Sequence, residues 1–147
     1  KKTKNHNPIK PINKMKTIVL IERGKDGLYW LRTSGLQNMI MGSGSSLQEA
    51  KEDFEICLQD MKESYTECGE ALPEELVNLS FEYKYDTASA LTAFSFINLA
   101  ALAKEVGINA SLLRQYKKGQ YISQAQAKKI QEGIHRLGER MMTFNLI

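Results

Sequence analysis

Residues 98–119, NLAALAKEVGINASLLRQYKKG, decide the fold of the carboxyl-terminal part of this chain. Gly107 can adopt the left-handed conformation that ends a helix, and Ala103, four residues earlier, is small enough for a second helix to pass closely. Apolar residues recur at helical spacing on both sides of this glycine. They are Leu99, Leu102 and Val106 before it and Ile108, Leu113 and Tyr116 after it. The stretch therefore predicts two short helices that cross at a tight turn.

The outward positions of the second helix carry side chains that can bind base edges and phosphates. They include Asn109, Ser111, Arg114, Gln115, Lys117 and Lys118, with no acidic residue among them. The stretch resembles the helix-turn-helix of the phage-repressor class. We expect Ser111, Arg114 and Gln115 to read bases in the major groove. Lys117 and Lys118 are expected to hold phosphates, and a helical hairpin with a merely solvated polar face is the alternative.

Charge is distributed unevenly along the 147 residues, although the net charge is only +3. Residues 97–147 carry eight basic and three acidic side chains, and the first sixteen residues carry six lysines and no acid. Residues 17–96 carry six basic and fourteen acidic side chains. This polarity suggests two partners of opposite charge, nucleic acid for the basic end and a basic protein for the acidic middle.

The acidic middle begins with a pattern of short strands. The β-branched run at 16–22 predicts a strand buried on both faces, and 28–31 predicts a second strand after a turn rich in Gly and Asp. Residues 38–41 predict a third strand, which leads into Gly42-Ser43-Gly44. At 77–85 apolar and polar residues alternate strictly, which predicts a fourth strand in a small antiparallel sheet with one face in water.

A long helix is predicted between the third and fourth strands. Ser46 and Glu49 form a capping box, in which each side chain satisfies a free amide of the first turn. Apolar residues then recur at three- and four-residue steps, so the helix lays one stripe on the sheet and turns its acids outward. The stripe comprises Leu47, Ala50, Phe54, Leu58, Met61 and Tyr65.

Together these patterns predict an α+β chain of two domains. Residues 15–86 form a βββαβ unit with an antiparallel sheet, and residues 87–147 form an all-α helix-turn-helix domain. The latter is expected to open with a helix to Phe96, capped by Asp86 or Thr87, and to end with a helix from Ser123 to Arg140. Lys128, Lys129 and Arg136 of that last helix are available to phosphates. Residues 1–14 are rich in Lys and Asn and predict a flexible basic tail.

This order of elements resembles the HicB-type antitoxins of bacterial toxin–antitoxin pairs. Residues 44–50, GSSLQEA, are similar to the start of that family's long helix, where a Gly, a capping residue and a Leu-x-Glu-Ala step are usual. The resemblance spans most of residues 15–140. The chain departs from the family's pattern in lacking the Pro-Gly turn that often precedes the third strand.

The resemblance implies that the first domain has a truncated ribonuclease H-like fold without catalysis and that it binds and occludes a small basic toxin ribonuclease, HicA. It also implies that the helical domain binds the promoter DNA of its own operon. Acidic candidates for toxin contact are Glu49, Glu52, Asp53 and Asp60, and a solvated helix face is the alternative for them. Because one helix-turn-helix reads only a few base pairs, we expect a homodimer or a higher oligomer.

Two other classes of function remain open, a stand-alone or ligand-sensing repressor and a ribonuclease H-like enzyme. The enzyme would need clustered carboxylates to hold two metal ions. Glu22, the helix acids and Asp86 do not converge in the predicted fold, and His6 and His135 form no hydrolytic triad. We therefore expect no enzymatic activity, no metal and no cofactor.

Cysteine content and hydropathy bear on location. Cys57 and Cys68 have no metal-like spacing, which indicates a reduced intracellular protein. The longest apolar run, 99–103, is far shorter than a membrane span, and 18–21 is too short for a signal-peptide core. The sequence predicts a cytoplasmic protein that makes no membrane contact.

Overall fold

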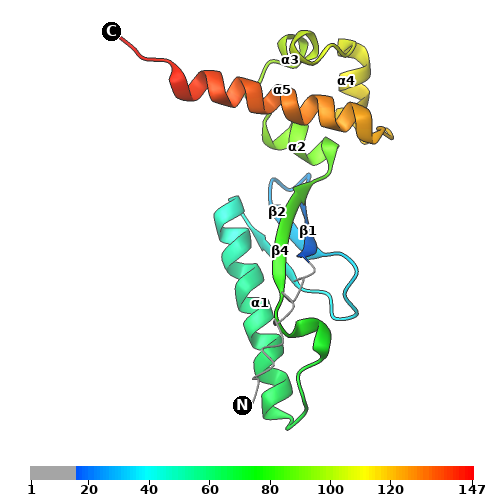
Figure 1. Ribbon diagram of the computed structural model, residues 1–147, viewed down its shortest axis with the longest axis vertical. Coiled ribbons are helices and arrows are strands. Elements are labelled where there is room, and N and C mark those ends of the chain that lie inside the picture. Colours follow the sequence, from blue (N-terminus) through cyan, green and yellow to red (C-terminus); the bar gives the residue numbers. More distant parts are fainter. Residues whose placement is uncertain (1–15) are drawn as a thin grey trace, which may run out of the picture.

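The computed structural model describes residues 16–147, which form a four-stranded mixed sheet and five α-helices (Figure 1). The tail predicted at residues 1–14 lies outside the described residues. In chain order the elements are β1 (Lys16–Arg23), β2 (Tyr29–Thr33), β3 (Met41–Gly44), α1 (Leu47–Glu67), the 3-10 helix η1 (Glu74–Leu76), β4 (Ser80–Tyr85), α2 (Thr87–Ala93), α3 (Leu99–Val106), α4 (Ala110–Lys117) and α5 (Gln124–Thr143). This confirms the α+β class.

The sheet has the strand order β3-β2-β1-β4, and its topology corrects the predicted antiparallel sheet. β1 pairs antiparallel with β2, and β2 pairs antiparallel with β3, but β4 runs parallel to β1. A parallel pair requires a long crossover connection, which α1 supplies because it carries the chain back to the end of the sheet where β3 began. The alternation at 77–85 showed a half-buried strand and carried no information about direction.

Among residues 16–147, α1 covers one face of the sheet, and no helix covers the other. Val19 and Ile21 of β1 are buried under α1, whereas Ile18 and Leu20 point to the opposite face and are only half-buried. The prediction that β1 is buried on both faces was therefore wrong. A continuous apolar run is typical of a strand covered on both sides, but here Glu22 and Arg32 form an ion pair on the open face, which leaves that face partly wet.

β3 lies three residues later than predicted, because Gly42 and Gly44, which were expected to follow the strand, belong to it. Gly42 and Gly44 face α1 so closely that a Cβ at Gly42 would lie 2.5 Å from the carbonyl oxygen of Ala50. A Cβ at Gly44 would lie 2.6 Å from the amide nitrogen of the same residue. Glycine is required here by the close approach of strand and helix, and sequence alone does not distinguish this use from a turn.

The segment that precedes β3 is held by a carboxylate from a distant part of the chain. Glu75 of η1 accepts hydrogen bonds from the amides of Gln37 and Asn38, at 3.1 and 3.0 Å, and a third from the Asn38 side chain. These donors, the Asn38 amide first, lower the pKa of Glu75 from its ordinary 4.5. After η1 the chain turns at Asn78, whose φ is +58°, so β4 begins at Ser80 and is shorter than predicted.

The buried side chains form two separate cores, one from residues 19–76 and the other from residues 91–130. These clusters fall on either side of the boundary predicted between residues 86 and 87. Phe54 of α1 stands at the centre of the first core, with its ring edge-on to Phe81 at 5.1 Å. The second core joins α2 to α5 around Leu102 and Leu113.

α2 connects the two halves of the molecule. Its predicted cap is confirmed at Asp86, whose carboxylate accepts a hydrogen bond from the Ser89 amide at 2.9 Å. The Ser89 hydroxyl in turn accepts a hydrogen bond from the Arg23 amide at the end of β1, at 3.0 Å. As Figure 1 shows, α2 lies between the sheet and α5, with the other helices of this half beyond it.

None of the helices formed by residues 16–147 combines the length and the apolar character needed to cross a bilayer.

Candidate nucleic-acid and partner interfaces

α3 and α4 meet at the turn that the sequence predicts. Gly107 ends α3 with a φ of +67°, and the amide of Ile108 donates to the carbonyl of Ala103 at 3.1 Å. The predicted inward residues are buried in the second core, with Leu113 fully enclosed and only Leu99 half-buried. The two helices are therefore fixed against each other by packing, which gives α4 a defined outward face.

The outward face of α4 presents a basic and polar set of side chains. Ser111, Arg114, Gln115, Lys117 and Lys118 are all exposed, as predicted. Within residues 16–147, none of these five side chains takes part in a hydrogen bond or an ion pair. They are free to bind an anionic or polar ligand along one helix face.

Asn109 has a second role that the sequence reasoning missed. Its side-chain oxygen accepts a hydrogen bond from the Ser111 amide at 2.8 Å, so it is the N-cap of α4. An asparagine before a helix is a common capping residue, and this signal was present in the sequence. Asn109 therefore positions the helix whether or not it also touches a ligand.

α5 is joined to α3 by an ionic contact between residues far apart in the sequence. The Glu105 carboxylate binds Arg136 Nε at 3.2 Å and an Arg140 guanidinium nitrogen at 3.3 Å. Arg136 also donates to the Glu105 carbonyl at 3.0 Å. Arg136 was predicted to be available to phosphates, but its guanidinium is engaged in orienting the helices. Lys128 likewise lies 3.8 Å from Glu132, whereas Lys129 is exposed.

The outer face of α1 is a dense acidic surface. The helix carries seven acidic and two basic residues, and Lys51, one of these two, turns inward over the Tyr83 ring at 4.6 Å. An exposed isoleucine, Ile56, lies within the acidic face with 58% of its surface accessible. Glu52 and Asp60 lie four residues before and after it, Glu55 and Glu63 lie three residues from these two acids, and all four are exposed. We call these five residues the α1 acidic face.

Two of the four predicted acidic contacts belong to the structure of the domain instead. Glu49 accepts hydrogen bonds from the Ser45 hydroxyl and amide, and these donors lower its pKa. Asp53 accepts the Ser43 amide at 2.8 Å, which closes the outer edge of β3. The Ser46 half of the capping box is confirmed, because its hydroxyl accepts the Glu49 amide at 3.1 Å. Glu52 and Asp60 remain on the α1 acidic face.

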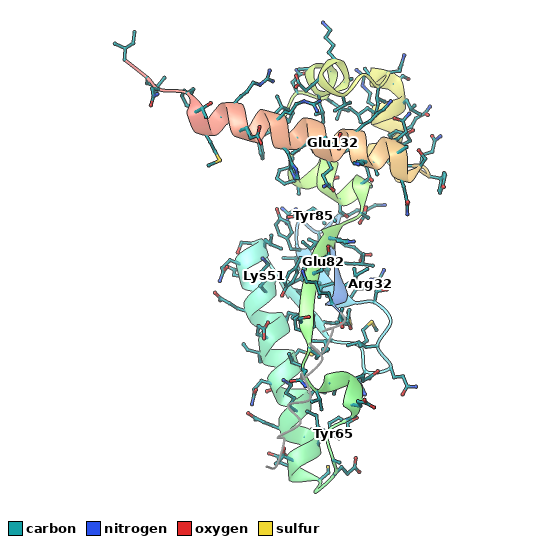
Figure 2. All side chains as sticks on the ribbon, viewed as in Figure 1. Arg32, Lys51, Tyr65, Glu82, Tyr85 and Glu132 are labelled. Atoms are coloured by element: carbon teal, nitrogen blue, oxygen red, sulfur yellow. The ribbon has the colours of Figure 1, made fainter. Side chains whose placement is uncertain are left out.

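The α1 acidic face and the α4 outward face lie on different halves of an elongated molecule. In Figure 2, Tyr65 near the end of α1 lies in one half, and Glu132 of α5 lies in the other, well separated from it. Sequence reasoning missed Glu55, Glu63 and Ile56. Helical periodicity could have placed all three on the face opposite the apolar stripe.

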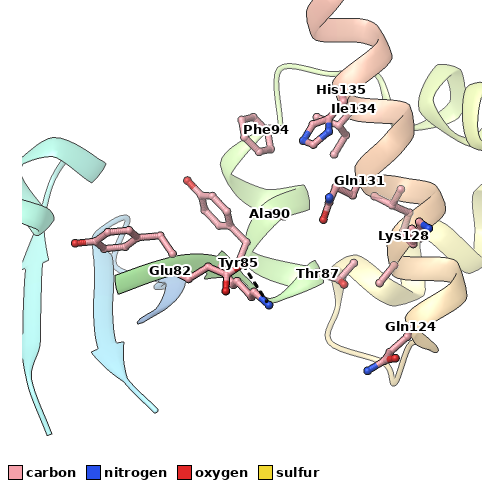
Figure 3. Close-up of a pocket in the computed structure, with 14 residues that line it drawn as sticks. Glu82, Tyr85, Thr87, Ala90, Phe94, Gln124, Lys128, Gln131, Ile134 and His135 are labelled. Atoms are coloured by element: carbon pink, nitrogen blue, oxygen red, sulfur yellow. Dashed lines mark ion pairs between the residues drawn. The ribbon is translucent and has the colours of Figure 1, made fainter. Parts of the chain in front are cut away.

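A cleft of about 680 Å³ separates β4 and α2 from α5 (Figure 3). Tyr85 and Phe94, whose rings lie 5.9 Å apart, line one side, and Gln131, Ile134 and His135 line the other. Burial raises the pKa of Tyr85, so its phenol stays protonated and can donate a hydrogen bond. The cleft combines aromatic surface with polar groups, which is typical of sites for small polar molecules.

No three His, Cys, Asp or Glu side chains in the described part of the chain are grouped so that they could hold a metal ion. Cys57 is half-buried, Cys68 is exposed, and both are free thiols. His135 borders the cleft and has no carboxylate or nucleophile among its hydrogen-bond partners in residues 16–147.

No protein-family model, curated protein or solved structure matches this chain. The candidate interfaces therefore rest on the chemistry and placement of the chain's own residues.

Proposed function

We propose that this protein is an antitoxin of the HicB type, which neutralises a small basic toxin ribonuclease of the HicA type and represses its own operon. The observation that carries the proposal is the separation of charge: an acidic helix face on one half and a basic helix-turn-helix on the other. Among residues 16–147, the only hydrogen bonds or ion pairs that involve the side chains of the α1 acidic face and the α4 outward face run along α1, from Gln48 to Glu52 and from Gln59 to Glu63. A protein that binds a basic partner and DNA at the same time needs both surfaces.

The sheet half supports a truncated ribonuclease H-like fold. Three consecutive antiparallel strands are followed by a helix that crosses the sheet and a fourth strand placed parallel beside the first. The carboxylates that metal-dependent hydrolysis would require are dispersed, since Glu22 pairs with Arg32 and Asp86 caps α2. These residues support a binding role in place of catalysis.

The α1 acidic face would bind the toxin. At protein interfaces a few central side chains supply most of the affinity, while the contacts around them exclude water. The surrounding carboxylates would attract a basic protein and accelerate its association. Ile56 is therefore the anchor and Glu52, Glu55, Asp60 and Glu63 provide specificity for a basic surface.

The α4 outward face would bind the promoter. Ser111, Arg114 and Gln115 would reach base edges, while Lys117 and Lys118 would neutralise phosphates on either side. Glu105, held by Arg136 and Arg140, fixes α3 against α5 and so sets the angle at which α4 enters the groove. A homodimer would place two such helices on successive turns of the DNA.

A growth-rescue assay tests the toxin half of this proposal. The chain is co-expressed with the small basic protein encoded beside its gene, and rescue and 1:1 co-purification are scored. Ile56→Lys should abolish both, because it places a cation where a basic partner docks. Met39→Lys is the matched control, since Met39 is about equally exposed but lies outside α1. Rescue that survives Ile56→Lys would reject the α1 acidic face as the toxin site.

A ligand-sensing repressor is the second candidate, and the cleft between β4 and α5 favours it. A small molecule bound there would touch both halves and could change how α5 sits against the sheet. The test is whether filling the cleft with Ala127→Trp alters promoter affinity, compared with Ala125→Trp, an exposed residue of the same helix that does not line the cleft. An antitoxin that needs no ligand should bind promoter equally with either change.

A further inference from the structure

The apolar stripe of α5 continues past the helices that cover it. Apolar residues recur along α5 and just beyond it at alternating three- and four-residue steps. They are Ala127, Ile130, Ile134, Leu137, Met141 and Phe144. This is the spacing by which one helix packs along another in a seam.

Burial changes abruptly along this stripe. Ile130 is only 3% exposed in the second core, and Ile134 and Leu137 pack against that core. Met141 and Phe144 continue the same stripe but are 52% and 63% exposed. Figure 1 shows the reason, since the second half of α5 projects beyond the helices it packs on. Within one copy of the chain, the described residues therefore cover the first part of the stripe and leave its last part exposed.

Gly138 is a second indication that another helix packs against this part of α5. Glycine is unfavourable inside a helix, so a close neighbour usually accounts for it. At Gly133 the neighbour is visible, because Val106 fills the space that a Cβ would need. At Gly138 no heavy atom among the described residues lies within 4 Å of that space. Gly138 lies beside the open end of the stripe, where a second helix could approach closely.

We propose that the second half of α5 is the homodimer interface, in which two copies of α5 cross at Gly138 and bury Met141 and Phe144 against each other. The inference rests on the proposed function, because a two-fold operator requires each subunit to supply one self-complementary surface. The charged residues beside the stripe are compatible with a second copy of the chain. Arg136 and Arg140, which flank the stripe, already bind Glu105 of their own chain, so a second copy leaves neither of them unpaired.

Two adjacent methionines provide a matched test. The dimer dissociation constant is measured by sedimentation velocity on the full chain, without DNA or toxin. Met141→Lys should raise it by at least roughly tenfold, as expected when an interface anchor is lost. Met142→Lys, which is 86% exposed and lies off the stripe, should leave it within about twofold of the wild-type value. A monomeric wild-type chain, or equal effects of the two changes, would overturn the proposal.

Gly138→Ala gives a second test, because the two interpretations of this glycine predict different effects on dimerisation. On a free helix surface, alanine stabilises the helix and leaves association unchanged. At a helix crossing, the added methyl separates the two copies, so the monomer becomes more thermostable while the dimer weakens. An unchanged dimer would overturn the crossing at Gly138.

These measurements separate this inference from the proposed function. A dimer that depends on Met141 but binds no promoter would reject repression and leave the interface standing. Specific promoter binding by a chain that is monomeric on and off DNA would reject the interface and leave repression standing.

Discussion

Replacing Gly42 with alanine tests how closely β3 holds α1, and so how the α1 acidic face is positioned. The new Cβ would lie 2.5 Å from the Ala50 carbonyl oxygen and 2.7 Å from Phe54 Cα, where ordinary contact begins at 3.4 Å. Both of these atoms belong to the backbone of α1, so no side-chain rotation can relieve the clash. The Phe54 amide nitrogen lies closer still, so the helix has to withdraw by more than about 0.9 Å, the difference between 3.4 and 2.5 Å.

The cost follows from what α1 buries. Ala50 and Phe54 are fully enclosed against the sheet, so a shift of the helix loosens the centre of the first core. Overpacking of a well-packed site costs about 1 to 3 kcal/mol in the free energy of unfolding. A loss of about 2 kcal/mol lowers the melting temperature of a domain of this size by about 8 to 16 °C.

Trp30 makes the measurement selective. It is the only tryptophan in the chain and lies in β2, so its fluorescence during urea unfolding reports on the sheet half. Ser43→Ala is the control, because Ser43 is the next residue of β3 and points to the face away from α1. The reasoning is refuted if Gly42→Ala changes stability by less than about 0.5 kcal/mol, or if Ser43→Ala costs as much.

Four further predictions concern the other parts of the molecule. Arg114→Ala should weaken promoter binding by about 1 to 3 kcal/mol with little effect on random DNA, as measured by competition gel shift; equal losses on both would contradict base reading. Lys118→Ala should weaken all sequences alike and reduce the salt dependence of binding by about one unit of slope, whereas an unchanged slope would exclude a phosphate contact. Leu113→Ala should cost about 2 to 5 kcal/mol in the helical half, followed by far-UV circular dichroism, because Leu113 is fully buried; half-buried Leu112→Ala should cost less. The pKa of Glu75 is lowered chiefly by the Asn38 amide, so its stabilising effect is present above the unfolded pKa and is lost as pH falls through the folded one. The melting-temperature advantage of wild type over Glu75→Gln should therefore shrink below about pH 4, and a constant advantage would contradict this.

Patterns in the sequence predicted those features well that depend on interactions between residues a few positions apart in the chain. Ser46 and Asp86 mark helix starts because a side-chain oxygen satisfies an amide three residues on, and both predicted caps are present. The left-handed Gly107 is present for a similar reason, since the end of a helix needs that conformation. The turn between α3 and α4 followed from these signals together with the apolar residues on either side of it.

The errors arose where distant residues decide the outcome. Gly42 and Gly44 belong to β3 because α1 approaches them, and nothing within the sequence near them reports that approach. The parallel placement of β4 depends on the path of the whole crossover, which alternation cannot encode. Glu75 holds a loop 37 residues away, and Glu105 holds two arginines on α5, so neither partner could be read from spacing.

The candidate binding residues show why the net charge of a segment overstates how many of its charged side chains are available to a partner. Residues 17–96 carry fourteen acidic side chains. Four of these carboxylates already accept hydrogen bonds from backbone amides, namely Glu49, Asp53, Glu75 and Asp86. A carboxylate that is already hydrogen-bonded stabilises the fold and has less capacity to accept from a partner. On the α1 acidic face, Glu55 and Asp60 have no hydrogen-bond or ionic partner among the described residues, whereas Glu52 and Glu63 accept hydrogen bonds from Gln48 and Gln59. On the basic half, Glu105 engages Arg136 and Arg140, whereas Lys104, Lys129 and the exposed side chains of α4 have no such contact among the described residues. A surface proposed for binding therefore has to be judged by the side chains that the chain's own contacts leave available.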